Sequence, residues 1–200
     1  MPGDDRDHHR RSIRLDEYDY AESGAYFVTI CTQGHLCLFG EIVDGQMRMN
    51  ALGQMVQETW CDLPSHYPHV ELDAFVVMPN HVHMVIVLTE GNDLVGAGFK
   101  PALVHGSVPM PDAAKRHRLS EIVRAFKTFS SRQVGRCRGT QGVPLWQRNY
   151  YEHIIRSERA LNHIRRYIAE NPLRWAQDRE NPAATAPEAP DAWRIDHDSS

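Results

Sequence analysis

An α+β fold is predicted for this chain of 200 residues, with a four-stranded antiparallel sheet and two helices packed on one of its faces. Short runs rich in β-branched and aromatic residues alternate with longer segments of helical periodicity, in the order strand, helix, strand, strand, helix, strand. Only Pro79-Asn80 separates the two middle strands, which favours an antiparallel hairpin. This order is the ferredoxin-like arrangement, and it leaves over one further helix near the C-terminus.

The first half of the predicted domain contains three strands and one helix. The strands are expected at 25–32, 70–78 and 81–88. A short hairpin is expected from segments at 36–39 and 47–49. Asn50 is a suitable N-cap for a helix whose apolar residues recur at helical spacing up to Pro64.

The second half contains two helices and one strand. Ser120 is expected to cap a helix that turns Ile122 and Phe126 toward the core and a basic face toward solvent. A turn-rich connector at 136–142 and a strand at 150–155 follow. Ser157 is expected to open the last helix, which should end at Asn171 because proline disfavours helical geometry at the residue before it.

Composition predicts the boundaries of the domain. The predicted parts are a polar arm at 1–24, a globular domain at 25–178 with a loop insertion at 89–118, and a disordered tail at 179–200.

Several classes of protein are excluded by length and composition. The chain is too short for a large multidomain enzyme, and no apolar run approaches the roughly 20 residues that cross a bilayer. The N-terminal residues lack the apolar stretch of a secretory signal. The four cysteines show no C-x-x-C spacing, so we expect reduced thiols in a cytoplasmic protein.

Charge is distributed unevenly along the chain. The net charge is −4, yet residues 115–166 hold thirteen Lys and Arg against three Glu, a local net charge of +10. Such a block is typical of a surface that binds a polyanion, and a set of solvated helix faces is the alternative.

Two histidines and the last helix are the candidate site. His81 and His83 lie two residues apart in a strand, so both imidazoles point to one face, as two ligands of one divalent metal do. In the last helix Tyr167 and Asn171 share one stripe beside an apolar stripe that can dock on the sheet. Docking would bring the Tyr167 phenol and the Asn171 amide oxygen to the two imidazoles.

This constellation favours cleavage of a phosphodiester. A phenol has a pKa near 10 and needs a cation or a base to act as a nucleophile. A hard cation, Mg²⁺ or Mn²⁺, held by His81, His83 and Asn171 would polarise the scissile phosphate. Attack by Tyr167 would form a phosphotyrosine and release a 3′ hydroxyl, which retains the bond energy for rejoining.

Three stretches resemble a known family. Met78-Pro-Asn-His-Val-His-Met-Val-Ile-Val resembles the signature strand of the single-tyrosine HUH transposases. Trp146-Gln-Arg-Asn-Tyr-Tyr-Glu-His-Ile-Ile-Arg and Tyr167-Ile-Ala-Glu-Asn-Pro are similar to the branch called REP-associated tyrosine transposases, and Leu119-Ser-Glu-Ile-Val-Arg-Ala-Phe-Lys is similar to its middle helix. The resemblance covers about Tyr26 to Trp175.

The resemblance implies a ferredoxin-like nuclease that binds single-stranded DNA carrying hairpins from palindromic repeats. It implies metal ligation by His81 and His83, a nucleophilic role for Tyr167 and a third, amide-type ligand at Asn171. Insertion-sequence relatives work as dimers with the tyrosine supplied in trans, whereas the REP-associated branch is generally thought monomeric, so both a monomer and a homodimer stay open.

Basic side chains on the last two helices and beside them are the candidate DNA contacts. The expected set is Arg124, Lys127, Arg132, Arg165 and Arg166, with Arg148 and Arg156 as second choices. Trp146 and Tyr150 are candidates for base stacking or for the core, and His153 and His163 are competing acid-base or metal candidates.

Two other functions remain open. One is a non-catalytic ferredoxin-like module that binds RNA or DNA, although such modules need exposed aromatics on central strands that are mostly aliphatic here. The other is a zinc hydrolase in which Cys61, or His66 and His69, act as additional ligands.

Overall fold

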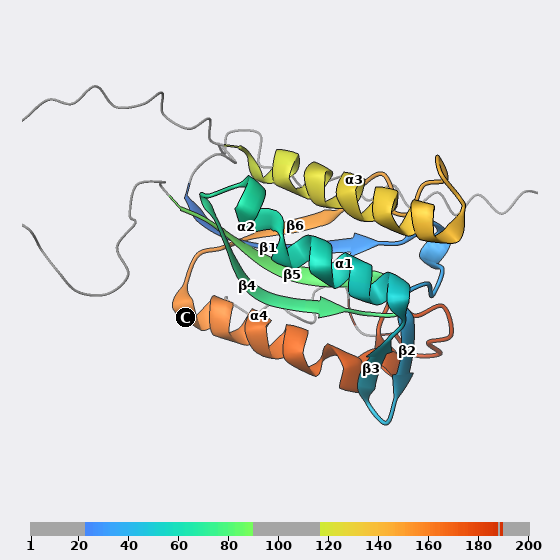
Figure 1. Cartoon of the computed structure of the whole chain (residues 1–200). Coiled ribbons are helices and arrows are strands. Elements are labelled where there is room, and N and C mark those ends of the chain that lie inside the picture. The colour runs from blue at the N-terminus through green and yellow to red at the C-terminus, as the bar shows by residue number, and fades with distance from the viewer. Residues whose placement is uncertain (1–22, 90–116, 188, 190–200) are drawn as a thin grey trace, which may run out of the picture.

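The computed structural model describes residues 23–89, 117–187 and 189 of the chain. Three layers lie on one another: a central sheet, a layer of helices α1 and α3 on one face, and helix α4 on the other (Figure 1). The predicted arm at 1–24 and the loop insertion at 89–118 fall almost wholly outside the described residues. No helix of the described residues is long and apolar enough to cross a membrane.

The central sheet has four strands in the order β4-β5-β1-β6, and each neighbouring pair is antiparallel. The strands are β1 (Gly24–Cys31), β4 (Val70–Val77), β5 (His81–Leu88) and β6 (Tyr151–Ile155). With helices joining β1 to β4 and β5 to β6, this is the predicted ferredoxin-like topology, which is confirmed. The predicted hairpin forms around Pro79-Asn80 and sets β5 beside β4.

Side chains of the two central strands alternate between the faces of the sheet. On β5, Val82 and Met84 belong to the large core under α1 and α3, whereas Val85 belongs to the smaller core under α4. On β1, Val28 belongs to the large core and Phe27 belongs to the smaller core. Period-two alternation therefore places His81 and His83 on the face that α4 covers.

Helices α1 (Ala51–Cys61) and α3 (Leu119–Arg138) form the layer over the large core. Asn50 caps α1 as predicted, because its side chain accepts hydrogen bonds from the backbone N–H groups of Leu52 and Gly53. The expected cap at Ser120 is wrong: Arg118 is the N-cap of α3, and its backbone N–H donates to the Glu121 carboxylate. Helix α3 also continues into the expected connector and ends at Gly139, in the left-handed region.

Helix α4 (Glu158–Glu170) covers the opposite face of the sheet. Ser157 caps it as predicted, and Ile164 and Ile168 are buried against Phe27 and Val85. Arg165 fastens the outer side of the helix to β4 through two hydrogen bonds to the Asp73 carboxylate. A 3₁₀ helix, η2 (Asn171–Gln177), continues from α4 with Pro172 in its first turn.

Smaller elements differ from the expectation. The peripheral hairpin consists of β2 (Gly40–Val43) and β3 (Gln46–Met49), so the strand expected at 36–39 starts later than predicted. A short helix, α2 (Leu63–His66), follows α1, and a 3₁₀ turn, η1 (Gln33–His35), follows β1.

The ordered chain continues past the expected boundary at 178. The described residues beyond it form turns, and Glu180 is 6% exposed and packs against the end of β1. The composition of this segment is that of a disordered tail, but a single buried carboxylate with several partners holds its first residues in place.

Candidate active site

The two histidines of β5 lie in van der Waals contact under α4. Their Nε2 atoms are 3.1 Å apart, and His81 and His83 are fully or almost fully buried. Each ring is oriented through its other nitrogen: His81 Nδ1 lies 2.9 Å from the Asn80 side-chain oxygen, and His83 Nδ1 lies 2.8 Å from Thr29 Oγ1. An Nδ1–H that donates to these oxygens leaves both Nε2 lone pairs facing one point, as metal-ligating histidines require.

Burial keeps both imidazoles neutral. Loss of hydration lowers the pKa of His81 to about 4 and that of His83 to about 3, and the neighbouring His81 lowers the pKa of His83 further. Neutral imidazole is the form that binds a metal ion, so at neutral pH neither ring has to lose a proton first.

Tyr167 reaches this pair from α4. Its ring lies 5.3 Å from the His83 ring and 6.2 Å, edge-on, from the Phe27 ring. The buried neighbours Ile164 and Ile168 fix the rotation of the helix, so the half-buried Tyr167 faces the strand that carries the histidines. The structure therefore brings together His81, His83 and Tyr167 in one chain.

Two buried oxygens complete the cluster. Asn171 is 1% exposed and its side chain interacts with His81 and Asp178, while its Oδ1 has no hydrogen-bond partner. Asp178 is 5% exposed, and its Oδ2 also has no hydrogen-bond partner while it lies 3.7 Å from His81 Nε2. Orphaned buried oxygens carry a large desolvation penalty, and a cation beside the two imidazoles would remove it. The residues present therefore fit a divalent metal.

Asp178 was not predicted from the sequence. It stands at the start of a segment rich in Asp, Glu, Ala and Pro, and no spacing relates it to the histidines. It reaches them because η2 turns the chain back under the sheet. Burial raises the pKa of Asp178, whereas nearby His83 lowers it.

Four of the expected DNA contacts line one groove. The groove has a volume of about 880 Å³ and runs between α3 and the segment that leads to β6; its basic lining residues are Arg124, Lys127, Arg132, Arg136 and Arg148, with no acidic residue. Lys127 Nζ donates to the backbone carbonyls of Gln147 and Arg148, at 2.7 and 2.9 Å, and so holds that segment against the helix. The groove is lined by five of the thirteen basic residues of the basic block.

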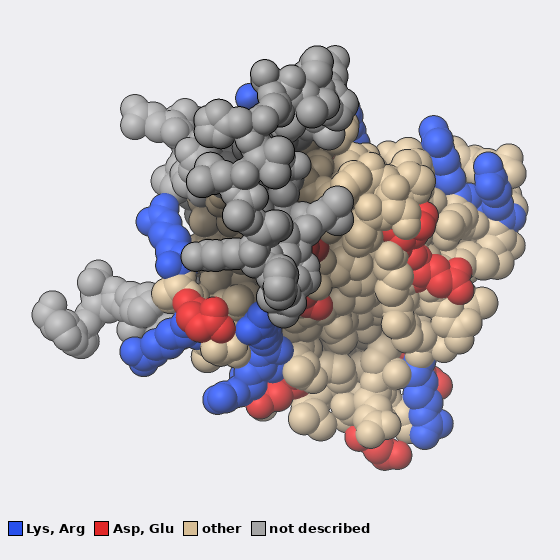
Figure 2. Space-filling view, turned by 60° about the vertical axis from the view of Figure 1, so that its left-hand side comes forward, with Lys and Arg blue, Asp and Glu red and all other residues tan. Residues whose placement is uncertain are grey.

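The other expected contacts lie elsewhere. Arg165 is engaged with Asp73, while Arg156 and Arg166 are exposed and outside the groove lining. Figure 2 shows one face of the molecule on which Lys and Arg are scattered among acidic and uncharged residues rather than gathered. The described residues on that face therefore show no continuous basic patch.

The aromatic candidates divide between core and groove. Trp146 is 4% exposed, packs against Phe39 and Phe126 and donates from its indole nitrogen to Ser130 Oγ, so its role is in the core. Tyr150 is half-buried and lines the groove.

Neither the expected zinc ligands nor the competing histidines join a ligand cluster. Among the described residues, groups of three ligating side chains with atoms within 4.8 Å of one another occur at His81, His83 and Asp178 and at Cys31, His35 and Glu180. Neither group includes Cys61, His66, His69, His153 or His163. His66 pairs instead with Asp62, and His69 with the backbone of His117.

Comparisons with known proteins agree with this architecture. An uncharacterised protein of Haemophilus influenzae is 40% identical over 171 residues, which is 86% of this chain and 92% of the relative. A second protein of that organism, named "Putative REP-associated tyrosine transposase", is 25% identical over 78% of this chain and 74% of its own length. No protein-family model matches the chain.

A solved structure shows the same fold. It is described as a REP-associated tyrosine transposase bound to a REP hairpin, and it superposes with a TM-score of 0.53 over 81% of this chain and 74% of that chain, at 21% identity. The predicted fold class is confirmed by this likeness. The chain therefore shares its fold with a REP-associated tyrosine transposase, and it is similar in sequence to a second protein that carries that name.

Proposed function

We propose that this protein cleaves and rejoins single-stranded DNA that carries hairpins, with Tyr167 as the nucleophile. The observation that carries the proposal is the position of the Tyr167 ring, 5.3 Å from His83, over a cluster of buried metal-ligand atoms. A tyrosine with only a packing role would not require a buried, neutral imidazole beside its ring.

The proposed step exchanges one phosphodiester for another. The Tyr167 oxygen attacks the scissile phosphorus and loses its proton, a phosphorus–oxygen bond to Tyr167 forms, and the bond to the 3′ oxygen breaks. The departing strand leaves as a 3′ hydroxyl after taking up a proton. The 5′ phosphate remains on the protein, and attack by another 3′ hydroxyl reverses the step without an external energy source.

A divalent metal is proposed at His81, His83, Asn171 and Asp178. When bound, such a cation polarises the scissile phosphate and stabilises charge that develops on its oxygens. Imidazole ligands suit softer ions than magnesium, while carboxylate and amide oxygens suit magnesium and manganese, so the mixed set favours Mn²⁺ over Mg²⁺. Thr29 and Asn80 hold the two rings in the orientation that ligation needs.

The basic groove is the proposed binding site of the DNA hairpin. Its basic side chains suit the phosphates of a nucleic acid backbone, and contacts of this kind set position rather than sequence. The segment that walls the groove also reaches the catalytic face, because Trp146 pairs with Thr32 and the Gln147 backbone N–H donates to the Cys31 carbonyl. Cys31 is the cross-strand partner of His81, so this segment links the groove to the end of the sheet that carries the histidine.

We propose that one subunit suffices for cleavage. Helix α4 of the same chain supplies Tyr167 to β5, which supports a monomer with its tyrosine in cis. A purely nucleic-acid-binding module is less well supported, since α4 covers the sheet face that such modules present to RNA.

The test compares Tyr167→Phe with Tyr151→Phe. Tyr151 is the matched control, because it lies on the same face and also contacts Phe27, with ring centroids 6.4 Å apart. A labelled single-stranded hairpin oligonucleotide with flanking sequence is incubated with each full-length protein and Mn²⁺, and covalent adducts are separated on a denaturing gel. Tyr167→Phe should bind the oligonucleotide and form no adduct, while Tyr151→Phe should form it.

An undiminished adduct in Tyr167→Phe would refute the assignment. Cleavage that persists fully in excess EDTA would refute the metal. Binding without any adduct in the unmutated protein would favour the non-catalytic alternative.

A further inference from the structure

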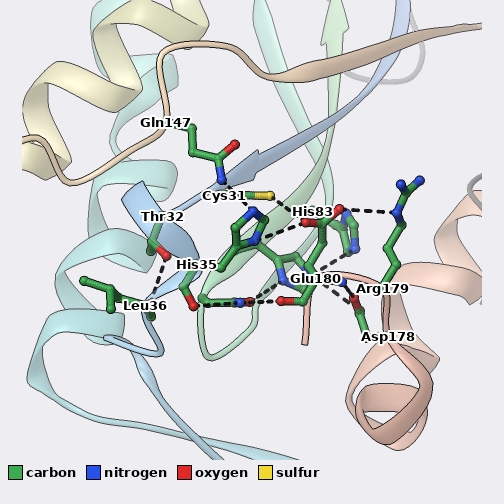
Figure 3. A network of polar contacts seen from close by, with 11 residues as sticks. Cys31, Thr32, His35, Leu36, His83, Gln147, Asp178, Arg179 and Glu180 are labelled. Carbon is green, nitrogen blue, oxygen red and sulfur yellow. Dashed lines mark hydrogen bonds and ion pairs between the residues drawn. The ribbon is translucent and has the colours of Figure 1, made fainter. Parts of the chain in front are cut away.

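A second cluster of ligand atoms lies beside the first and has no part in the proposed cleavage. Cys31 ends β1, His35 lies in η1, and Glu180 comes from the segment after η2 (Figure 3). Two residues at the end of β1 and in the turn after it therefore meet a carboxylate from a segment far along the chain.

The distances in this cluster match a tetrahedral zinc site. Glu180 Oε2 lies 3.4 Å from Cys31 Sγ and 3.3 Å from His35 Nδ1, and the three ligand atoms all lie within 4.8 Å of one another. Zinc bonds of about 2.0 to 2.3 Å at tetrahedral angles separate neighbouring ligand atoms by about 3.3 to 3.6 Å. Only a small movement is needed to centre an ion among them.

Burial favours a bound ion over an ordinary surface contact. Cys31 is 8% exposed and Glu180 is 6% exposed, so a thiol and a carboxylate share a site that water scarcely reaches. The His35 side chain is 41% exposed, which leaves one side of the cluster open for a water molecule as fourth ligand.

The backbone turn after β1 brings His35 next to Cys31 and Glu180. Gly34 and His35 have φ values of 66° and 53°, both in the left-handed region, so the chain turns sharply after β1. A non-glycine residue held there is strained, and such strain persists where surrounding contacts enforce it. The Asn80 side-chain amide enforces it by donating to the backbone carbonyls of His35 and Glu180.

The donor set separates this cluster from the histidine pair. A thiolate, an imidazole and a carboxylate together suit Zn²⁺, whereas the neighbouring set of two imidazoles and two oxygens contains no sulfur. The Gln147 amide lies 2.8 Å from His35 Nε2, and with its oxygen turned inward it would accept the Nε2–H and leave Nδ1 free to bind the ion.

We propose that Cys31, His35 and Glu180 bind one Zn²⁺ ion that fastens the segment after η2 to the end of β1. As the sulfur–zinc bond forms, the Cys31 thiol gives its proton to the solvent, and the fourth position is taken by water. Bound there, the ion holds the segment that carries Asp178 against the sheet.

Cobalt(II) tests the proposal, because it replaces zinc in tetrahedral sites and shows a sulfur-to-metal charge-transfer band only when a thiolate is a ligand. The reduced full-length protein is titrated with CoCl₂ and then with ZnCl₂. We expect the band to reach the intensity of one thiolate-bound cobalt per protein, and zinc to remove it. The double variant His81→Gln/His83→Gln should keep the band, since those residues belong to the sulfur-free cluster.

Cys31→Ser should lose the band, and Cys61→Ser, an exposed cysteine of α1, is the matched control that should keep it. If Cys31→Ser does not fold, His35→Gln provides the same test, because the partly exposed His35 side chain can be changed without opening the core. The His35→Gln protein should need at least about tenfold more cobalt to reach half of the full band intensity. Absence of the band in the unmutated protein, its persistence in Cys31→Ser, or unchanged cobalt affinity in His35→Gln would overturn the proposal.

Discussion

The two faces of the sheet bury different kinds of side chain. The face under α1 and α3 is a continuous apolar core that includes Phe126, Trp60 and Met84. The face under α4 has a small apolar cluster around Phe27, and next to it lie buried imidazoles, carboxylates and a thiol. Burying such polar groups lowers stability unless they bind a partner, so the second face is where function is to be expected.

The largest effect should come from the apolar face. Phe126→Ala removes a fully buried ring of α3 and should lower the free energy of unfolding by about 3 to 5 kcal/mol. Urea denaturation followed by circular dichroism measures it. Tyr167→Phe is the comparison from the other face and should change stability by less than about 1 kcal/mol. Equal losses in the two variants would remove the distinction between the faces.

A smaller effect is expected from the support of His83. Thr29→Val removes the hydroxyl that orients the His83 ring and should weaken Mn²⁺ binding by about 10- to 100-fold. The manganese dependence of adduct formation measures it, with near-normal rates expected at saturating metal. Thr128→Val is the control for loss of a threonine hydroxyl, because that hydroxyl donates only to a carbonyl of its own helix; Thr128 lines the groove, so the manganese requirement and not the DNA affinity is compared. An unchanged manganese requirement in Thr29→Val would count against ligation by His83.

The basic groove should contribute to the affinity for DNA but not to the cleavage step. Arg132→Ala should weaken binding of a hairpin oligonucleotide uniformly across sequences. It should also make the slope of log K against log salt concentration less steep by about one. Arg138→Ala is the control, since Arg138 is exposed on the same helix but does not line the groove. Equal losses in both variants would show a diffuse electrostatic effect instead of a groove.

A further change should appear with pH in the metal-free protein. The pKa values of His81 and His83 lie below the value of about 6.5 for an unfolded chain, so between pH 6.5 and 4 the unfolded state binds more protons. Stability should therefore fall as the pH is lowered through this window. The raised pKa of Asp178 acts in the opposite direction and reduces the effect. Thermal unfolding in EDTA measures it, and His81→Gln/His83→Gln should show a flatter profile.

The periodic parts of the site were predictable from the sequence. Residues two apart in a strand share a face, which placed His81 with His83. The apolar stripe of α4 fixed which side of that helix docks, and with it the direction of Tyr167. Both inferences depend on the regular spacing of side chains in a strand or a helix, which can be read from the local sequence.

Residues brought in by irregular structure were not predictable. Asp178 and Glu180 approach the sheet through a 3₁₀ helix and turns, whose path depends on tertiary contacts such as that between Asn80 and Glu180. His35 depends likewise on two left-handed residues after β1. The N-cap of α3 was misplaced because Ser120 is a strong capping type, whereas the local hydrogen bonds to Glu121 favour a start at Leu119.

Mapping of the covalent product tests the central claim most directly. The unmutated protein is incubated with the hairpin oligonucleotide and Mn²⁺, digested with protease and nuclease, and the modified peptide is located by mass spectrometry. The account predicts a nucleotide attached through its 5′ phosphate to Tyr167. Attachment to Tyr151 or to any other residue would contradict it.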